Sequence, residues 1–467
     1  MILTGLIVGI AFGIIVQRGR FCVTGMLRDI YLNKSWRGFT ALMILIAVHS
    51  LGLTLLTQTG VLSPKVDPFA PLAVMVGGFV FGLGIILAGG CASGTWYRSG
   101  EGLVGSWFAL ITYGLSAAAM KYGPLQPINS GLKEWTLPLT TIHGALGISP
   151  WILVATVWIF TIGLVRHYFA KDAARQKLDF GQSWWSRPLN MNVAGALIGV
   201  LGTIGFVLSA ASGRNSGLGI TTPTGNLVAY MATGDAAEYI DWGVLLVLGL
   251  LVGAVIAAKL SGEFRVRVPD SQTLVRAIWG GVLMGIGAAW AGGCTVGNGM
   301  VETSLFSFQG WVALLFIALG VFAGAKLWLK PKSAPQQAAS TETATPAAKD
   351  FGFAIASGVD QPAVSSSGVV APVSVLAKPE TKVSDSGLKP LGEGRYALDT
   401  LGAVCPFPLI EAKQAMKQLD VGEAVVIDFD CTQATDSIPA WAADDGHLIT
   451  DFERTGDAGW QITVVKG

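Results

Sequence analysis

The chain has 467 residues, of which 52% are hydrophobic and 13% are charged, and its mean hydropathy is +0.56. A water-soluble protein of this length would be less apolar, so the composition predicts a polytopic α-helical membrane protein. The formal net charge of +1, without a basic patch, excludes a nucleic-acid partner. Five cysteines do not make a disulfide framework, and we expect no metal and no cofactor.

Residues 1–330 contain nine apolar stretches, each close to the roughly 20 residues that a membrane-spanning helix requires. They lie near residues 2–17, 39–57, 70–90, 102–120, 149–169, 192–211, 242–260, 274–293 and 310–329. The first stretch has no basic region before it and no small-x-small cleavage site after it. We therefore interpret it as a span in the lipid bilayer rather than as a signal peptide.

Basic residues predict the orientation of the chain. Lysines and arginines are concentrated after the first, fifth, seventh and ninth stretches. All four of these loops fall on one side if the N-terminus is outside, and the excess of positive charge makes that side cytoplasmic. We therefore expect a multi-pass protein of the cell inner (cytoplasmic) membrane whose C-terminal region is in the cytoplasm.

Two segments of the membrane part resemble each other. Residues 78–107 and 280–311 each consist of a glycine-rich apolar stretch, the tetrapeptide Ala-Gly-Gly-Cys, a small-residue loop, a Glu, a Gly and a Trp. The tetrapeptides end at Cys91 and Cys294. The chain therefore contains two copies of one unit, formed by stretches one to four and six to nine.

Stretch five connects the two copies, and an odd connecting span inverts the second copy. A weaker match between residues 19–22 and 213–216 supports the same division. Inverted repeats with glycine-interrupted helices are typical of transporters, in which the substrate site lies where the two halves meet.

Three cysteines lie at these helix breaks and loops, namely Cys22, Cys91 and Cys294. Backbone groups at a glycine break are tolerated at membrane depth only where they are buried in protein or line a cavity. Close helix packing is the simpler explanation for a single glycine-rich motif. Its repetition with the same flanks favours a transport path instead. Cys22 lacks a repeat partner, because Ser216 or a neighbour takes that place.

The predicted path contains weak neutral hydrogen-bond donors. No Asp, Glu, Lys or Arg lies well inside a predicted span, although ion-coupled transporters usually keep such residues there. Thiols, hydroxyls and backbone N–H groups suit a soft anion that partly dehydrates. Arg20, Arg98 and Arg214 are accessory candidates that would attract the anion at the two mouths. The alternative role for these arginines is interfacial snorkelling.

Residues 1–330 resemble the YeeE/YedE family of sulfur-compound transporters, through the Arg-Phe-Cys loop at Cys22 and the two Ala-Gly-Gly-Cys loops. The resemblance implies that thiosulfate moves along the thiols of Cys22, Cys91 and Cys294 by S–H hydrogen bonds.

A linker and a small domain follow the membrane part. Residues 331–394 are rich in Ala, Ser, Thr, Pro and Gln, which favours a flexible tether. Residues 395–467 alternate strand, helix, strand, helix, strand, strand, and predict a small two-layer α/β sandwich. The expected elements are strands 396–401, 423–429, 447–452 and 461–465, with helices in 404–419 and 434–443.

Cys405-Pro406-Phe407-Pro408 directly precedes a helix pattern in this domain. Proline is favoured in a first helical turn, so we interpret Cys405 as the N-cap residue. The positive end of the helix dipole would favour an exposed, nucleophilic thiolate there. Cys431 either resolves or relays sulfur, or is a buried thiol at a strand end.

The domain resembles the TusA/SirA/YeeD family of sulfur carriers, through the CPxP motif, Leu398-Asp399 with Gly402, Ile438-Pro439-Ala440-Trp441 and Gly446-His447. The resemblance implies that Cys405 carries sulfane sulfur as a persulfide. The chain departs from the family pattern at 430–432, where many carriers have Asp-Pro.

Together these features predict thiosulfate uptake coupled to capture of the sulfane sulfur on Cys405, and delivery to downstream sulfur-accepting proteins. Whether the C-terminal domain is an enzyme stays open, because it could act as a carrier or as a thiosulfate sulfurtransferase. Two alternatives remain: a transporter of another sulfur or selenium compound, and a membrane-anchored sulfurtransferase whose membrane part is only a scaffold.

Overall fold

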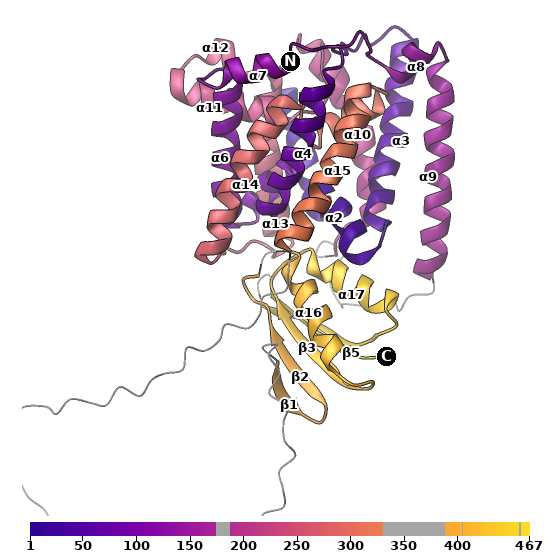
Figure 1. Ribbon diagram of the computed structural model, residues 1–467, viewed down its shortest axis with the longest axis vertical. Coiled ribbons are helices and arrows are strands. Elements are labelled where there is room, and N and C mark those ends of the chain that lie inside the picture. The colour runs from indigo at the N-terminus through magenta and orange to yellow at the C-terminus, as the bar shows by residue number, and fades with distance from the viewer. Residues whose placement is uncertain (174–186, 330–387, 404, 457–458) are drawn as a thin grey trace, which may run out of the picture.

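The computed structural model describes residues 1–173, 187–329, 388–403, 405–456 and 459–467 (Figure 1). A helical membrane part lies against a small α/β tail domain, and the N-terminus lies at the end of the membrane part away from that domain. The basic stretch 174–186 and most of the predicted linker lie outside the described residues.

The membrane part is a bundle of long helices with shorter ones between them. The long helices are α1 (Thr4–Arg18), α3 (Arg37–Gln58), α4 (Pro71–Leu87), α6 (Val104–Lys121), α9 (Pro150–Ala173), α10 (Met191–Ala211), α13 (Trp242–Leu260), α14 (Ser271–Trp290) and α15 (Phe308–Trp328). Each coincides with one of the nine predicted stretches. Eight segments of the described chain are long and apolar enough to cross a membrane; α6 is not among them. The protein is thus a multi-pass membrane protein.

Four long helices are each followed, after a break, by a short helix. The short helices are α2 (Val23–Asn33), α5 (Ala92–Gly100), α11 (Thr221–Thr233) and the π-helix η1 (Gly297–Glu302). After α4 and α14 the break occurs at Gly89 and Gly292, whose φ angles are +72° and +75°. A side chain disfavours this left-handed conformation, so glycine ends both helices just before the two cysteines.

Glycines also allow close helix packing. α4 and α14 run antiparallel, and a Cβ atom on Gly280 or Gly287 would overlap the backbone of α4 at Ala88 or Phe81. α1 packs in parallel on α13, and α3 packs in parallel on α10. Small residues in these contacts let backbones approach, and such packing holds membrane helices together where the hydrophobic effect between them is weak.

The packing is reciprocal between the two predicted copies. α1 contacts α13 as α10 contacts α3, and α4 contacts α15 as α14 contacts α6. α1 and α13 run toward the tail domain, whereas α10 and α3 run away from it, so equivalent helices have opposite directions. The inverted repeat itself stays a prediction. Span five corresponds to α9, which packs on α3 at the edge of the bundle (Figure 1). The short helices α7 (Gln126–Lys133), α8 (Ile142–Leu146) and α12 (Ala236–Tyr239) complete the end away from the tail domain.

The tail domain is a five-stranded sheet with two helices. Its elements are β1 (Lys389–Gly392), β2 (Arg395–Asp399), α16 (Phe407–Gln418), β3 (Ala424–Phe429), α17 (Ala434–Asp444), β4 (Leu448–Gly456) and β5 (Gly459–Val465). The strand order is β1-β2-β3-β5-β4, with β2 and β3 parallel and the other pairs antiparallel. The described sheet begins at Lys389, within the predicted linker, because β1 pairs with β2 as an additional strand.

Both helices lie on the side toward the membrane part (Figure 1). Apolar residues of α16 and α17 share one core with the central strand β3, in which every residue except Asp428 is buried. One detail of the prediction is wrong. Helix α16 begins at Phe407 with Pro406 as its N-cap residue, so Cys405 lies before the N-cap and is not the N-cap residue that the sequence predicted.

Candidate functional site

Cys22 and Cys91 lie together inside the membrane part. Cys22 immediately precedes α2, and Cys91 is the N-cap residue of α5. Their Sγ atoms are 3.9 Å apart, and both side chains are buried. The Gly94 backbone N–H donates to Cys91 Sγ at 3.4 Å, and Ser93 Oγ lies at the same distance from that sulfur. Two helix starts therefore direct thiols and N–H groups at one point, which is an arrangement that can bind an anion.

Cys294 lies at the other end of the membrane part. It borders a cavity of about 160 Å³ that is also lined by Arg214, Thr221 and Glu302. We call this the far cavity, because it lies where α10 and α14 end, away from the tail domain. Arg214 pairs with Asp241 at 3.4 Å, and Glu302 is the repeat equivalent of Glu101.

The break at Cys294 is held open by amide side chains. Asn298 Nδ2 donates to the carbonyl oxygens of Ala291 and Gly293, each at 2.9 Å, and its Oδ1 accepts from Gln309 Nε2 at 2.9 Å. These bonds satisfy carbonyl groups that the interrupted helix leaves without intrahelical partners. The adjacent Thr295 Oγ1 is buried and has no hydrogen-bond partner among the described residues.

Tyr113 of α6 connects the two groups of cysteines. Its buried hydroxyl donates to Thr221 Oγ1 at 2.8 Å, and it interacts with both Cys294 and Cys91. The three membrane cysteines therefore do not form one cluster. Cys22 and Cys91 are in contact, and Cys294 follows beyond Tyr113.

The tail domain is bound to the membrane part by ion pairs. Arg20 Nη1 lies 3.0 Å from Asp436 Oδ2 in α17 and also contacts Thr435, while Arg20 Nη2 lies 3.1 Å from Glu263 Oε1. Arg267 and Asp430 are 3.9 Å apart. Arg20 is thus buried at the domain interface.

Two of the cavities at this interface are lined by cysteines. The larger one, of about 450 Å³, is lined by Cys22, Arg20 and Arg28 of the membrane part and by Asp436 and Trp441 of α17. We call it the side cavity. It gives Cys22 a polar surrounding on the side toward the tail domain.

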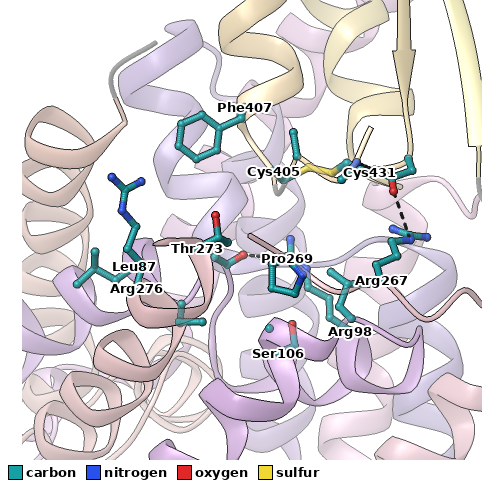
Figure 2. A pocket seen from close by; sticks show the side chains of 18 of the residues that line it. Leu87, Arg98, Ser106, Arg267, Pro269, Thr273, Arg276, Cys405, Phe407 and Cys431 are labelled. Carbon is teal, nitrogen blue, oxygen red and sulfur yellow. Dashed lines mark hydrogen bonds and ion pairs between the residues drawn. A yellow bond between two sulfur atoms is a disulfide. The ribbon is translucent and has the colours of Figure 1, made fainter. Parts of the chain in front are cut away.

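The smaller cavity, of about 80 Å³, is lined by Cys405 and Cys431 of the tail domain and by Arg98, Arg267 and Arg276 of the membrane part. We call it the interface pocket. Figure 2 shows Arg267 beneath Cys431 and Arg276 on the opposite side of the pocket. Three guanidinium groups facing two cysteines suit a small sulfur oxyanion, because arginine binds such anions with several N–H groups.

Arg98 links the membrane cysteines to the interface pocket. It lies on α5, donates to the carbonyl oxygen of Gly89 and interacts with Cys22. Equivalent parts of the two copies therefore line opposite ends. The first Ala-Gly-Gly-Cys loop contributes Ala88 and Gly89 to the interface pocket, and the second contributes Cys294 to the far cavity.

Cys405 and Cys431 form a disulfide with a Cα–Cα distance of 6.2 Å. Cys405 is 5% exposed and Cys431 is 9% exposed. The prediction of an exposed Cys405 thiolate at a helix N-cap is therefore wrong for this form of the protein. Cys431 is buried after a strand end, as one of the two alternatives required, but it is bonded rather than free. The pairing of β2 with β3 brings the two sulfurs together. A local helix pattern carries no information about such pairing.

A carboxylate pair lies next to the arginines. Gln17 Nε2 donates to Glu101 Oε1 at 3.1 Å and to Glu263 Oε2 at 2.7 Å. Burial, together with the charge of Glu263, raises the pKa of Glu101 to about 7. Burial opposes ionisation of Glu263 too, but Arg20 and Arg18 hold the pKa of that carboxyl below its usual value.

Sequence reasoning missed Tyr113, Arg267, Arg276 and Glu101 as site residues. Glu101 had a signal, because the repeat contains a Glu at the same place in each copy. Arg267 is one of the basic residues after the seventh stretch, which predicted only the orientation of the chain. Among the described residues, no group of three or more His, Cys, Asp or Glu is placed to hold a metal ion.

Comparisons with known proteins match both parts of the chain. A family model described as sulphur transport matches residues 18–323, and one described as sulfurtransferase TusA matches residues 396–466. The thiosulfate transporter TsuA of Escherichia coli (strain K12) is 44% identical over 335 residues, which are 70% of this chain and 94% of that protein. The thiosulfate transporter TsuA of Spirochaeta thermophila is 35% identical over 334 residues, 68% of this chain and 97% of that protein. TsuB of Escherichia coli (strain K12), named as a candidate sulfur carrier, is 59% identical over 69 residues, 15% of this chain and 92% of that protein.

Proposed function

Since the chain belongs to the sulphur transport family and carries a TusA domain at its C-terminal end, we propose that it takes up thiosulfate and transfers the sulfane sulfur to its own tail domain. One observation carries this proposal. Cys294 borders the far cavity, Cys22 and Cys91 are in contact, and Arg98, which interacts with Cys22, lines the pocket that contains the cysteine of the CPxP motif.

The membrane part, residues 1–330, carries the anion. Thiosulfate enters the far cavity, where Arg214 attracts it and Cys294 donates a hydrogen bond. It passes Tyr113, then Cys91 and Cys22, and leaves beside Arg98. Neutral donors suit this task, because a buried charge without a partner would hold the ion too tightly to release it. The residues 331–387 act as a tether that keeps the tail domain at the exit.

The tail domain completes the reaction when Cys405 is a thiol. The Cys405 thiolate attacks the outer sulfur of thiosulfate, the S–S bond breaks, and sulfite leaves with the bonding electron pair. Arg267 and Arg276 bind the sulfonate oxygens during this step. Cys405 retains the sulfane sulfur as a persulfide, which supplies downstream sulfur acceptors. Removal of thiosulfate at the exit makes net uptake one-way.

The docking face is the cytoplasmic face in this proposal. The ends of α1 and α13 and the loops with Arg20 and Arg267 lie there, in agreement with the excess of positive charge on cytoplasmic loops. The N-terminus lies at the opposite end and is outside.

Thiosulfate labelled with ³⁵S at its outer sulfur tests this function in cells that lack other importers. We expect wild-type cells to accumulate the label and to form unlabelled sulfite, and protein precipitated with acid during uptake to carry label through a bond that a thiol reductant cleaves. Cys405→Ser should lose the bound label. Arg267→Gln should require more thiosulfate for the same labelling, whereas Arg265→Gln, changed in the same loop, is the matched control. Accumulation of label in wild-type cells without formation of unlabelled sulfite would contradict the transfer step.

A further inference from the structure

The fold of the tail domain places Cys431 beside Cys405 independently of the bond between them. β2 and β3 are parallel neighbours, so the segments that follow them begin at the same edge of the sheet. Cys405 lies in the first of these segments and Cys431 in the second. The Thr400 N–H donates to the Asp428 carbonyl oxygen at 2.8 Å, and the Gly402 N–H donates to Asp430 Oδ1 at 3.0 Å. Both segments are therefore held in register.

The membrane part limits which groups can reach Cys405. The sulfur is 5% exposed and borders the interface pocket of about 80 Å³. On this measure one water needs roughly 10–15 Å³, so the pocket holds a small ion but no segment of another protein. The remaining cysteines, Cys22, Cys91 and Cys294, belong to the membrane part. In the docked protein Cys431 is the thiol closest to a sulfur carried on Cys405 (Figure 2).

We propose that Cys431 resolves the Cys405 persulfide and releases sulfide; this step rests on the proposed transfer of sulfane sulfur to Cys405. The Cys431 thiol transfers its proton to the terminal sulfur of the persulfide anion, and the resulting thiolate attacks Cys405 Sγ. The Cys405–Cys431 bond forms, the bond from Cys405 to the sulfane sulfur breaks, and that sulfur leaves as HS⁻ with the bonding electron pair. The two thiols are oxidised to a disulfide, and the sulfane sulfur is reduced to sulfide.

The disulfide in the structure is the product of this step. A low-molecular-weight thiol must reduce it before Cys405 can attack another thiosulfate. One cycle therefore converts thiosulfate and two thiols into sulfite, sulfide and a disulfide. Uptake is coupled to the supply of reductant, and the released product is substrate for enzymes that assimilate sulfide.

The surroundings of the pair favour the leaving anions. Arg267 lies 3.9 Å from Asp430, next to Cys431, and Arg98 and Arg276 line the same pocket. These guanidinium groups stabilise sulfite in the first step and HS⁻ in the second by charge. The resolving step needs no additional protein, because the acceptor thiol is in the same domain.

A single-turnover experiment on the full-length protein in detergent tests the proposal. The protein is reduced, freed of reductant without oxygen and mixed with thiosulfate, and sulfite, sulfide and the mass of the cysteine peptides are then measured. We expect wild-type protein to release sulfite and sulfide in equal amounts and to end with the Cys405–Cys431 disulfide. Cys431→Ser should release sulfite, retain the persulfide on Cys405 and release sulfide only after dithiothreitol is added.

The outcomes separate the two proposals. Cys405→Ser should release neither product. Wild-type protein that forms no sulfite would overturn the proposed transfer and this step with it. Wild-type protein that releases sulfite but keeps a stable persulfide, as Cys431→Ser does, would leave the transfer in place and overturn resolution by Cys431. Cys431→Ala, measured in parallel, separates loss of the thiol from an effect of the serine hydroxyl.

Discussion

Two pairs of cysteines lie on the two sides of Arg98, and they differ in their chemistry. Cys22 and Cys91 are 3.9 Å apart, whereas bonded sulfurs are about 2.05 Å apart, so these two are neighbouring thiols. Cys405 and Cys431 are joined. The first pair lies at two helix starts in the membrane part, and the second lies after two strand ends and lines a pocket with three arginines.

The difference indicates two uses of the same residue type. Thiols at helix starts, with backbone N–H groups beside them, can donate weak hydrogen bonds to a passing anion and release it. A cysteine with a second thiol and positive charges nearby can form and break covalent bonds. In the proposed function, passage and reaction are therefore separated in space, with Arg98 between them.

Removal of a membrane thiol should have the largest effect on uptake. A hydrogen bond to a charged group contributes about 1.5–3 kcal/mol, so Cys91→Ala should slow thiosulfate uptake about ten- to a hundredfold. Cys22→Ala should have a similar effect, because the two sulfurs are in contact. The measurement is initial uptake of labelled thiosulfate at matched expression, with Ala92→Ser as a control on α5. Uptake at the wild-type rate in both variants would assign the pair to helix packing.

Removal of the tail domain, which carries the second pair of cysteines, should have an intermediate effect on uptake. A chain that ends after Ala347 should insert into the membrane, because the helices of the membrane part pack mainly with one another. Its uptake should fall roughly three- to tenfold, since no acceptor is held at the exit. The tail domain supplied as a second chain should restore part of the uptake, and Asp436→Ala in that chain should reduce the recovery. A fragment that is inserted and stable but inactive would show that the tail domain belongs to the transport path.

Ionisation of Glu101 should have the smallest effect, which is a change in sulfite release with pH. Burial raises the pKa of Glu101 to about 7, so this carboxyl is mostly neutral near pH 6 and mostly ionised near pH 8. Its negative charge would oppose the arginines of the interface pocket, so anion capture should weaken as pH rises through 7. The ratio of sulfite release between Glu101→Gln and wild-type protein should therefore rise about two- to fivefold from pH 6 to pH 8. This ratio cancels the titration of the Cys405 thiol.

Glu302→Gln is the matched control for that experiment, because Glu302 occupies the equivalent place in the second copy and lines the far cavity. The ratio of sulfite release between Glu302→Gln and wild-type protein should stay constant from pH 6 to pH 8. A constant ratio for Glu101→Gln as well would mean that Glu101 does not titrate beside the bound anion.

Local patterns predicted the elements well. Apolar length predicted all nine long helices, because crossing the bilayer demands that length of every span. Alternation and the CPFP motif predicted the helices and four of the strands in the tail domain. β1 was missed, because Lys389–Gly392 contains two glycine or proline residues and forms a strand only by pairing with β2.

The sequence by itself determined the membrane class, the two glycine-rich breaks and the sulfur-carrier motif, because these depend on composition and on residues close together in the chain. Only the tertiary structure decided which cysteines meet. Cys22 and Cys91 are 69 residues apart, and Cys405 and Cys431 are 26 apart. The burial of Arg20 by Asp436 and the position of Arg267 next to Asp430 likewise depend on docking of the tail domain. Such contacts result from the packing of whole helices and strands, which local periodicity does not encode.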